Sequence, residues 1–145
     1  RGRGITIAYA SVYGHLKAAV EELASALEAR GQKVSVFDLA RDDMAEAVED
    51  AFRYDRLVLA SITYQGEIFP FMSTFIHTLA EHAYQNRTVA LVEAGSWAPA
   101  AAKVMTKELE GMKDIALTQN KVTVLGSLND ASRAQIEALA DELSK

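Results

Sequence analysis

Three short segments of the chain carry the residue types that bind phosphate groups and flat rings. They are residues 11–16, 61–67 and 93–99, and each follows an apolar run and precedes a stretch with helical spacing. A hydroxyl or a glycine at the start of a helix lets backbone N–H groups meet an anion. Tyr64 and Trp97, in the second and third segments, offer aromatic faces for stacking. Together the segments predict a site for a flat ligand with a phosphate tail.

Alternating strands and helices must position these segments. Short apolar runs, typical of buried strands, cover residues 5–10, 34–37, 57–61, 88–92 and 122–125. Between and after them, apolar residues recur at helical spacing. We expect the inward helix faces to consist of Leu16, Val20, Leu23, Ala24 and Leu27; Met44, Ala47, Val48, Ala51 and Phe52; Met72, Phe75, Ile76 and Leu79; Ala101, Val104, Met105, Leu109 and Met112; and Ile136, Leu139, Ala140 and Leu143.

Boundary residues support this division. Asp42 or Asp43 is expected to cap the second helix, Pro99 to open the fourth, and Asn129 or Asp130 to cap the last. The near-continuous apolar strands indicate a parallel sheet covered on both faces, and right-handed crossovers favour the strand order 2-1-3-4-5. The predicted fold is an α/β three-layer sandwich: a five-stranded parallel sheet with helices on both faces. The three segments then meet at the carboxyl edge of the sheet.

Several other phosphate-binding patterns are absent. The chain has no Gly-Lys-Ser/Thr nucleotide loop and no G-x-G-x-x-G dinucleotide loop. A receiver domain of this topology needs an aspartate at the end of strand three, where this chain has Ala60 and Ser61. A purely structural interpretation stays open for each segment: Ser11 as a helix cap, Tyr64 as a cover of the sheet edge, and Trp97 as a core residue.

Composition narrows the function classes. The length of 145 residues is typical of one domain, and a net charge of −5 without a basic run disfavours nucleic-acid binding. The absence of cysteine excludes thiolate metal sites, thiol catalysis and disulfides. No apolar run reaches membrane-spanning length and no signal-type segment opens the chain, so we expect a cytoplasmic protein with no membrane partner. Because the chain starts at Arg1, we expect residues 1–4 to be a linker or an expression remnant and 5–145 to be one domain of a longer protein.

The three segments and their flanks resemble a known family. YASVYGH (residues 9–15), VLASITYQGEIFP (58–70) and VEAGSWAP (92–99) closely resemble the flavodoxin-like domain of flavodiiron proteins, the A-type flavoproteins. The resemblance extends over essentially the whole chain. It implies the flavodoxin-like fold and FMN as cofactor, with the first loop on the phosphate and the other two bracketing the isoalloxazine ring. The FMN-binding residues so implied are Ser11, Tyr13, Gly14, His15, Leu16, Ile62, Thr63, Tyr64, Gln65, Gly66, Ala94, Gly95, Ser96 and Trp97.

The resemblance also implies a function and partners. In that family the flavin passes electrons to a di-iron centre in a metallo-β-lactamase-like domain of the same parent chain, which reduces dioxygen or nitric oxide. A rubredoxin-type protein or a reductase would be the electron donor, and a homodimer is compatible with the family. This chain has only His15, His77 and His82 and no His-x-Glu-x-Asp-His cluster, so we expect no metal site in it. We name no catalytic residue, because no nucleophile–base pair is evident.

Five positions depart from the family pattern. Leu16 stands where a threonine or similar donor is common, Ile62 replaces a proline, Gln65 an asparagine, Glu67 a glycine and Ala94 an asparagine. Loss of one hydrogen bond to a charged phosphate costs roughly 1.5–3 kcal/mol. An alternative hypothesis is therefore a flavodoxin-like module that no longer binds FMN and serves a structural or dimerisation role. A flavin or quinone reductase of the same fold would need a further substrate site, which the sequence does not indicate.

Overall fold

A central sheet and five helices make up the computed structural model, which describes residues 2–10, 14–64, 66–95 and 99–145, and for Tyr64 the backbone alone. The strands are β1 (Gly2–Ala10), β2 (Val34–Asp38), β3 (Tyr54–Tyr64), β4 (Glu67–Ile68), β5 (Arg87–Gly95), β6 (Ile115–Leu117) and β7 (Val122–Leu125). The helices are α1 (Gly14–Ala29), α2 (Met44–Arg53), α3 (Pro70–Glu81), α4 (Ala101–Leu109) and α5 (Asp130–Leu143).

The strand order agrees with the predicted topology, but the described residues form a sheet of seven strands rather than the predicted five. The sheet runs β2-β1-β3-β5, and the edge beyond β5 is shared by β6 and β7. These pairings are all parallel, and only the short β4 runs antiparallel, against β3. The predicted fifth strand is β7, with the expected bounds. The strand β6 was not predicted; it pairs with the first residues of β5, while β7 pairs with the last.

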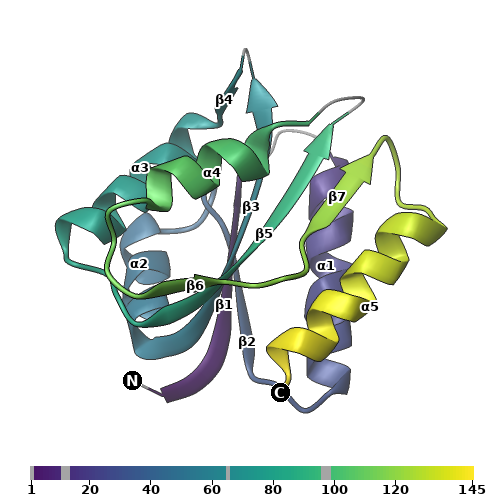
Figure 1. Ribbon diagram of the computed structural model, residues 1–145, viewed down its shortest axis with the longest axis horizontal. Coiled ribbons are helices and arrows are strands. Elements are labelled where there is room, and N and C mark those ends of the chain that lie inside the picture. The colour runs from purple at the N-terminus through teal and green to yellow at the C-terminus, as the bar shows by residue number, and fades with distance from the viewer. Residues whose placement is uncertain (1, 11–13, 65, 96–98) are drawn as a thin grey trace.

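Helices cover both faces of the sheet, as predicted. Figure 1 shows α1 and α5 on one side and α2, α3 and α4 on the other. On the first side, Val20 and Leu23 of α1 and Leu139 of α5 are buried against Ile7 and Val58 of the sheet. On the second side, Phe75 and Met105 belong to the cluster that contains Leu57 and Leu59. Neighbouring strand residues alternate between the two clusters, as the pleat of a doubly covered sheet requires.

Two expected helix caps are present. Asp43 accepts a hydrogen bond from the N–H of Ala45 and caps α2. Asn129 caps α5 and exchanges hydrogen bonds with Ser132 in a capping box. The fourth helix begins at Ala101, two residues after the proline that was expected to open it.

The first strand is longer than the apolar run indicated. It begins at Gly2, so residues 2–4, which we expected to be linker or remnant, lie in the strand. Gly2 pairs with Tyr54, and the N–H of Gly4 donates to the Asp55 carboxylate at 3.1 Å. Backbone pairing therefore extends β1 over residues 2–4, whose side chains do not show the apolar pattern typical of a strand.

Candidate functional site

The register of the sheet aligns the carboxyl-terminal ends of β1, β3 and β5 side by side. Ala10 of β1 pairs with Ser61 of β3, and Ser61 pairs with Glu93 of β5. The chain leaves β1 for α1 on one face of the sheet, and leaves β3 for α3 on the opposite face. Such a divergence opens a crevice at the carboxyl edge of a parallel sheet, where ligands of this architecture bind.

The first predicted loop joins β1 directly to α1. Ser11 and Tyr13 lie outside the described residues; Gly14 is the first residue of the helix and is exposed. The first N–H groups of a helix have no partner within it, and they carry a partial positive charge. Neither Asp nor Glu occurs in the first turn of α1. His15 is exposed in that turn. This helix start is therefore suited to an anion.

The fold itself gives no reason for a glycine at Gly14. Its φ is not positive, and a Cβ built on it would meet no atom of the described residues within 4 Å. An alanine would fit both the helix and the surrounding space. The missing side chain leaves open room against the backbone at the start of α1.

Leu16 belongs to the core rather than to the loop surface. Its side chain is 1% exposed and lies in the cluster that α1 and α5 form with the sheet. A ligand at the start of α1 can meet Leu16 only through its backbone N–H. The prediction from helical spacing, that Leu16 faces inward, is confirmed.

The second predicted loop is a β-hairpin. β3 continues to Tyr64, and the chain returns as β4, with Thr63 opposite Ile68 and Tyr64 opposite Glu67. Figure 1 shows this hairpin extending beyond the other strands. Gln65 lies outside the described residues, and the described part of the segment extends the sheet by pairing with β3 rather than forming an irregular loop.

The hairpin geometry explains how a glutamate fits at position 67. Glu67 stands where the family has glycine, and a positive φ there would be strained. In the structure Glu67 is an exposed residue of β4 without a positive φ. Gly66 takes the left-handed conformation instead, with φ of 81°. A glutamate at position 67, where the family has glycine, therefore causes no backbone strain.

The third predicted loop begins at the end of β5. Ala94 is 3% exposed and packs in the core cluster, level with Ile62, which is half-buried against the same cluster. Gly95 ends the strand, and a Cβ on it would lie 3.2 Å from the Cβ of Pro99. Proximity to Pro99 therefore accounts for this glycine. Ser96 and Trp97 lie outside the described residues.

Sequence reasoning missed the role of Glu93. Its side chain is buried, 5% exposed, beside the third loop. Its carboxylate accepts hydrogen bonds from the N–H of Ala102, at 2.9 Å, and from the hydroxyl of Thr123, at 2.7 Å. No local sequence signal marks this role, because both partners come from other elements of the fold.

Tyr9, near the end of β1, lies next to the first loop. Its side chain is buried, and its hydroxyl lies 3.5 Å from the Asp38 carboxylate at the end of β2. Burial and the neighbouring Asp38 charge raise the pKa of the Tyr9 phenol above its ordinary value. The phenol therefore stays neutral at physiological pH and serves as a hydrogen-bond donor.

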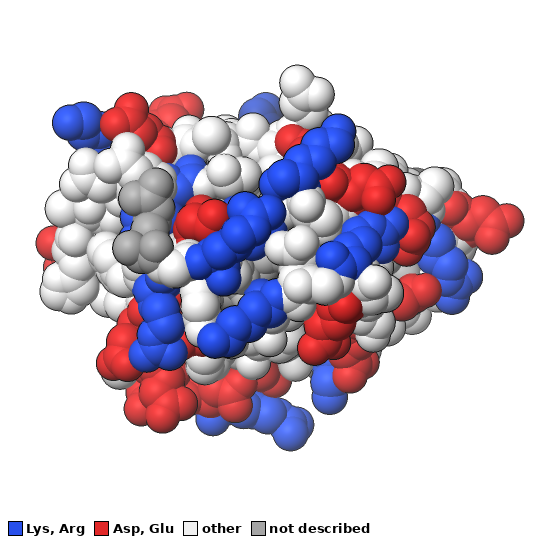
Figure 2. All heavy atoms as spheres, turned by 90° about the horizontal axis from the view of Figure 1, so that it is seen from below, with Lys and Arg blue, Asp and Glu red and all other residues white. Residues whose placement is uncertain are grey.

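The opposite edge of the sheet is basic. Figure 2 shows Lys and Arg side chains across the middle of the face at which the strands begin. Arg56 is buried and donates to the carbonyl of Leu143, the last residue of α5. Arg87 donates to the carbonyls of Phe52 and Tyr54. These two arginines satisfy backbone carbonyls and so stabilise the fold, far from the three loops.

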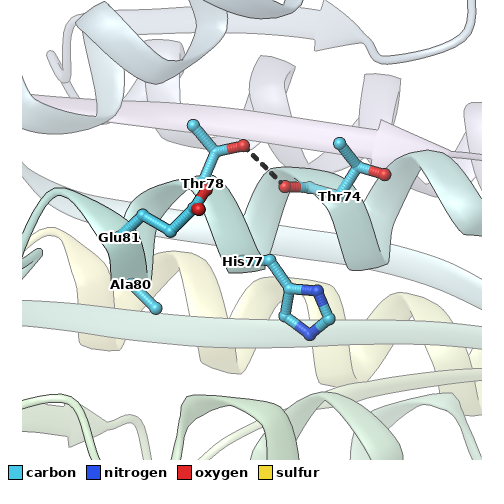
Figure 3. A pocket seen from close by; sticks show the side chains of 5 residues that line it. All are labelled: Thr74, His77, Thr78, Ala80 and Glu81. Atoms are coloured by element: carbon cyan, nitrogen blue, oxygen red, sulfur yellow. Dashed lines mark hydrogen bonds between the residues drawn. The ribbon is translucent and has the colours of Figure 1, made fainter.

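Surface hollows also occur away from the three loops. One lies on the exposed side of α3 and is lined by Thr74, His77, Thr78, Ala80 and Glu81 (Figure 3). Within it, Thr78 donates to the carbonyl of Thr74 at 2.8 Å, a bond inside the helix.

Among the described residues no three His, Asp or Glu side chains group as a metal site. No helix in the described part of the chain is long and apolar enough to cross a membrane.

Comparisons with known proteins agree with this geometry. The model of a protein family described as "Flavodoxin domain" matches residues 6–131. A search of curated proteins finds no match. Among solved structures, the chain is similar to a flavodoxin from the domain Archaea, with a TM-score of 0.83 and 16% identity over 97% of this chain and 96% of that one.

Larger proteins contain a similar domain. Rubredoxin oxygen:oxidoreductase from Desulfovibrio gigas matches with a TM-score of 0.90 and 17% identity over 97% of this chain and 35% of that one. A flavo di-iron protein variant from Thermotoga maritima matches with a TM-score of 0.84 and 22% identity over 99% of this chain and 36% of that one. The chain thus spans about a third of the length of these two proteins. At these identities the likeness shows the fold.

Proposed function

The chain belongs to the flavodoxin domain family, and from that premise we propose that it binds FMN non-covalently and acts as an electron-transfer domain. The observation that carries the proposal is the level register of Ala10, Ser61 and Glu93. This register brings the start of α1, the β3–β4 hairpin and the end of β5 to one edge of the sheet, which supports a shared site there. The start of α1 is suited to the phosphate of a ligand, and the two flanking segments are suited to a planar ring.

The residues present fit this cofactor at the phosphate end. Neither the φ of Gly14 nor contact with the described residues requires a glycine at this position. A phosphate held by the backbone N–H groups of Gly14, His15 and Leu16 would use the space that a side chain there would fill. Ser11 and Tyr13 complete the proposed phosphate loop on the strength of the family resemblance.

The ring end of the proposed site consists of the second and third loops. Ile62, Thr63, Tyr64, Gln65 and Gly66 would meet the ring from the hairpin side. Ala94, Gly95, Ser96 and Trp97 would meet it from the other side. Of these, Ala94 and Gly95 contribute through their backbone, since the side chain of Ala94 is buried and Gly95 has none.

When bound, FMN supplies one- and two-electron redox chemistry, and the protein supplies position and electrostatics. The hairpin presents Thr63 and the backbone of Gly66 on a paired, rigid support. The start of α1 would hold the phosphate through backbone N–H groups, without a side-chain cation. No side chain of the chain needs to take a proton from a substrate, so the proposal includes no catalytic residue.

We further propose that the parent protein is a flavodiiron-type oxygen or nitric oxide reductase. The family resemblance of the three loops supports this assignment, and so does the similarity to domains of the Desulfovibrio and Thermotoga proteins. The partner would be a metallo-β-lactamase-like di-iron domain of the same parent chain. A rubredoxin-type protein or a reductase would deliver the electrons.

One observation favours the alternative, a module without FMN that has a structural or dimerisation role. Leu16, Ile62 and Ala94, three of the positions that depart from the family, all contribute apolar side chains to the core cluster beneath the loops. These side chains pack in the core at positions where the family resemblance implies other residue types. A chain that binds no FMN but forms a stable dimer in light scattering would support this alternative.

A titration with FMN and with riboflavin tests the leading proposal. Riboflavin has the same ring system without the phosphate. We expect the chain to quench FMN fluorescence at saturation and to bind riboflavin at least about tenfold more weakly, because the phosphate contacts at α1 are lost. Equal affinity for the two would contradict the phosphate assignment. No binding of either would contradict the proposed function.

A further inference from the structure

We propose that Glu93 positions the third loop of the FMN site by joining the two ends of that loop through its buried carboxylate. The inference rests on the proposed function, although Glu93 itself is not one of the residues expected to meet FMN. Glu93 lies in β5, two residues before Gly95, where the strand ends. Its side chain is 5% exposed.

Both carboxylate oxygens of Glu93 are occupied by groups from other elements. Oε1 accepts a hydrogen bond from the N–H of Ala102, in the first turn of α4, at 2.9 Å. Oε2 accepts one from the hydroxyl of Thr123 in β7, at 2.7 Å. The ammonium group of Lys121 lies 3.7 Å from Oε2. The carboxylate therefore joins β5, β7 and the start of α4.

The start of α4 needs this carboxylate. The residue before the helix is Ala100, which has no side-chain acceptor, and the helix has no side-chain cap of its own. The first N–H groups of a helix need acceptors, and a negative charge is favourable at this end of the helix dipole. Glu93 supplies both from the neighbouring strand. Because a buried carboxylate is costly unless it is hydrogen-bonded, its position is fixed by these partners.

The contact sets the geometry of the third loop. The segment 96–100 connects Gly95, at the end of β5, to Ala101, at the start of α4. Glu93 and Ala102 lie just outside its two ends and are directly bonded to each other. This hydrogen bond directly joins the two elements that the loop connects. If the bond is lost, the start of α4 can move away from β5, and the loop moves with it.

Trp97 makes this proposal measurable without FMN. It is the only tryptophan of the chain and lies inside the loop. We would compare its emission and its quenching by acrylamide in the FMN-free wild-type chain, Glu93→Ala and Glu93→Gln. Glu93→Ala should change both signals and weaken FMN binding about tenfold, or about 1.4 kcal/mol. Glu93→Gln keeps an oxygen that can accept from Ala102, so it should restore the wild-type emission.

Glu142→Ala is the matched control. Glu142 also accepts hydrogen bonds from two backbone N–H groups, those of Gln119 and Asn120, but it lies on α5. Its loss should lower stability without changing the emission of Trp97. The proposal is overturned if Glu93→Ala folds and its Trp97 signals match those of the wild type, or if Glu142→Ala changes them equally.

A second variant covers the case in which Glu93→Ala does not fold. Thr123→Val removes one hydrogen bond to Glu93 and keeps the shape of the side chain. An altered Trp97 emission in this variant supports the proposal, and an unaltered one overturns it. A wild-type chain that binds no FMN contradicts the proposed function alone, because the Trp97 signals still decide the role of Glu93.

Discussion

A Cβ atom on Gly95 would lie 3.2 Å from the Cβ of Pro99, so Pro99 lies against the end of β5. This separation is shorter than an ordinary van der Waals contact between carbon atoms. Gly95→Ala should therefore displace Pro99 and the loop. We expect a loss of about 1–3 kcal/mol in the free energy of unfolding and weaker FMN binding. Denaturant titration and FMN titration measure the two effects.

The partner substitution provides the control for Gly95→Ala. Pro99→Gly removes the Cβ that the new methyl group would meet. The double variant should recover part of what Gly95→Ala loses, which would appear as a coupling between the two sites. Strict additivity of the two single variants would contradict the contact.

Gly14→Ala separates stability from ligand binding at the first loop. The new methyl group enters open space on a residue without positive φ, so the unfolded chain loses freedom while the fold is unstrained. We expect the free energy of unfolding to rise by about 0.4–1 kcal/mol. The same methyl group should obstruct the phosphate and weaken FMN binding, as fluorescence titration would show.

Riboflavin is the control ligand for Gly14→Ala. Because it has no phosphate, its affinity should be the same for the wild type and the variant. A variant that binds FMN as tightly as the wild type would show that the phosphate does not use the space at Gly14.

Glu142 connects α5 to the segment between β6 and β7, and this makes stability depend on pH. Burial alone would raise the pKa of its carboxyl, but hydrogen bonds from Gln119 and Asn120 outweigh burial and lower it. A lowered pKa in the folded state stabilises the fold above the ordinary glutamate pKa, and this stabilisation is lost as pH falls through the folded-state value. Glu142→Gln should cost about 1.5 kcal/mol at neutral pH and less in acid.

The exposed Glu28 provides the control for that pH dependence. Glu28→Gln removes the same charge from the surface of α1. Denaturant unfolding at neutral pH and below the ordinary glutamate pKa should give nearly equal stabilities for Glu28→Gln and the wild type. A Glu142→Gln variant whose deficit is as large in acid as at neutral pH would contradict the account.

Gly4 and Gly2 offer a matched pair at the start of β1. A Cβ on Gly4 would lie 2.6 Å from Cδ1 of Tyr54, whereas for one on Gly2 the nearest atom among the described residues is the carbonyl oxygen of Arg53, at 3.9 Å. Gly4→Ala should therefore destabilise the fold by about 1–3 kcal/mol, and Gly2→Ala should change little. Equal melting temperatures for the two variants would show that the N-terminal part of β1 is not needed for stability.

Most of the fold could be predicted from the sequence because hydrophobic spacing determines which side of an element is buried. The spacing of Met72, Phe75, Ile76 and Leu79 predicts the buried face of α3, and all four are fully buried. The length of β3 could not be predicted in this way. Its last residues, 62–64, are held by pairing with β4 and β5, which local composition does not reveal.

β6 shows the same limitation. Ala116 and Leu117 are exposed, so no apolar alternation marks the strand, which pairs with β5 and packs only Ile115 against the core. At the candidate site, the sequence indicated the three loops but not the role of Glu93, whose partners Ala102 and Thr123 become neighbours only in the folded chain. Residues that act through distant partners leave no periodic pattern to detect.

The measurement that tests the central claim most directly is the visible absorption spectrum of the purified chain after incubation with excess FMN and removal of unbound flavin. We predict that the two visible bands of oxidised flavin remain with the protein, at about one FMN per chain. A colourless protein after this treatment would contradict FMN binding and favour the structural alternative.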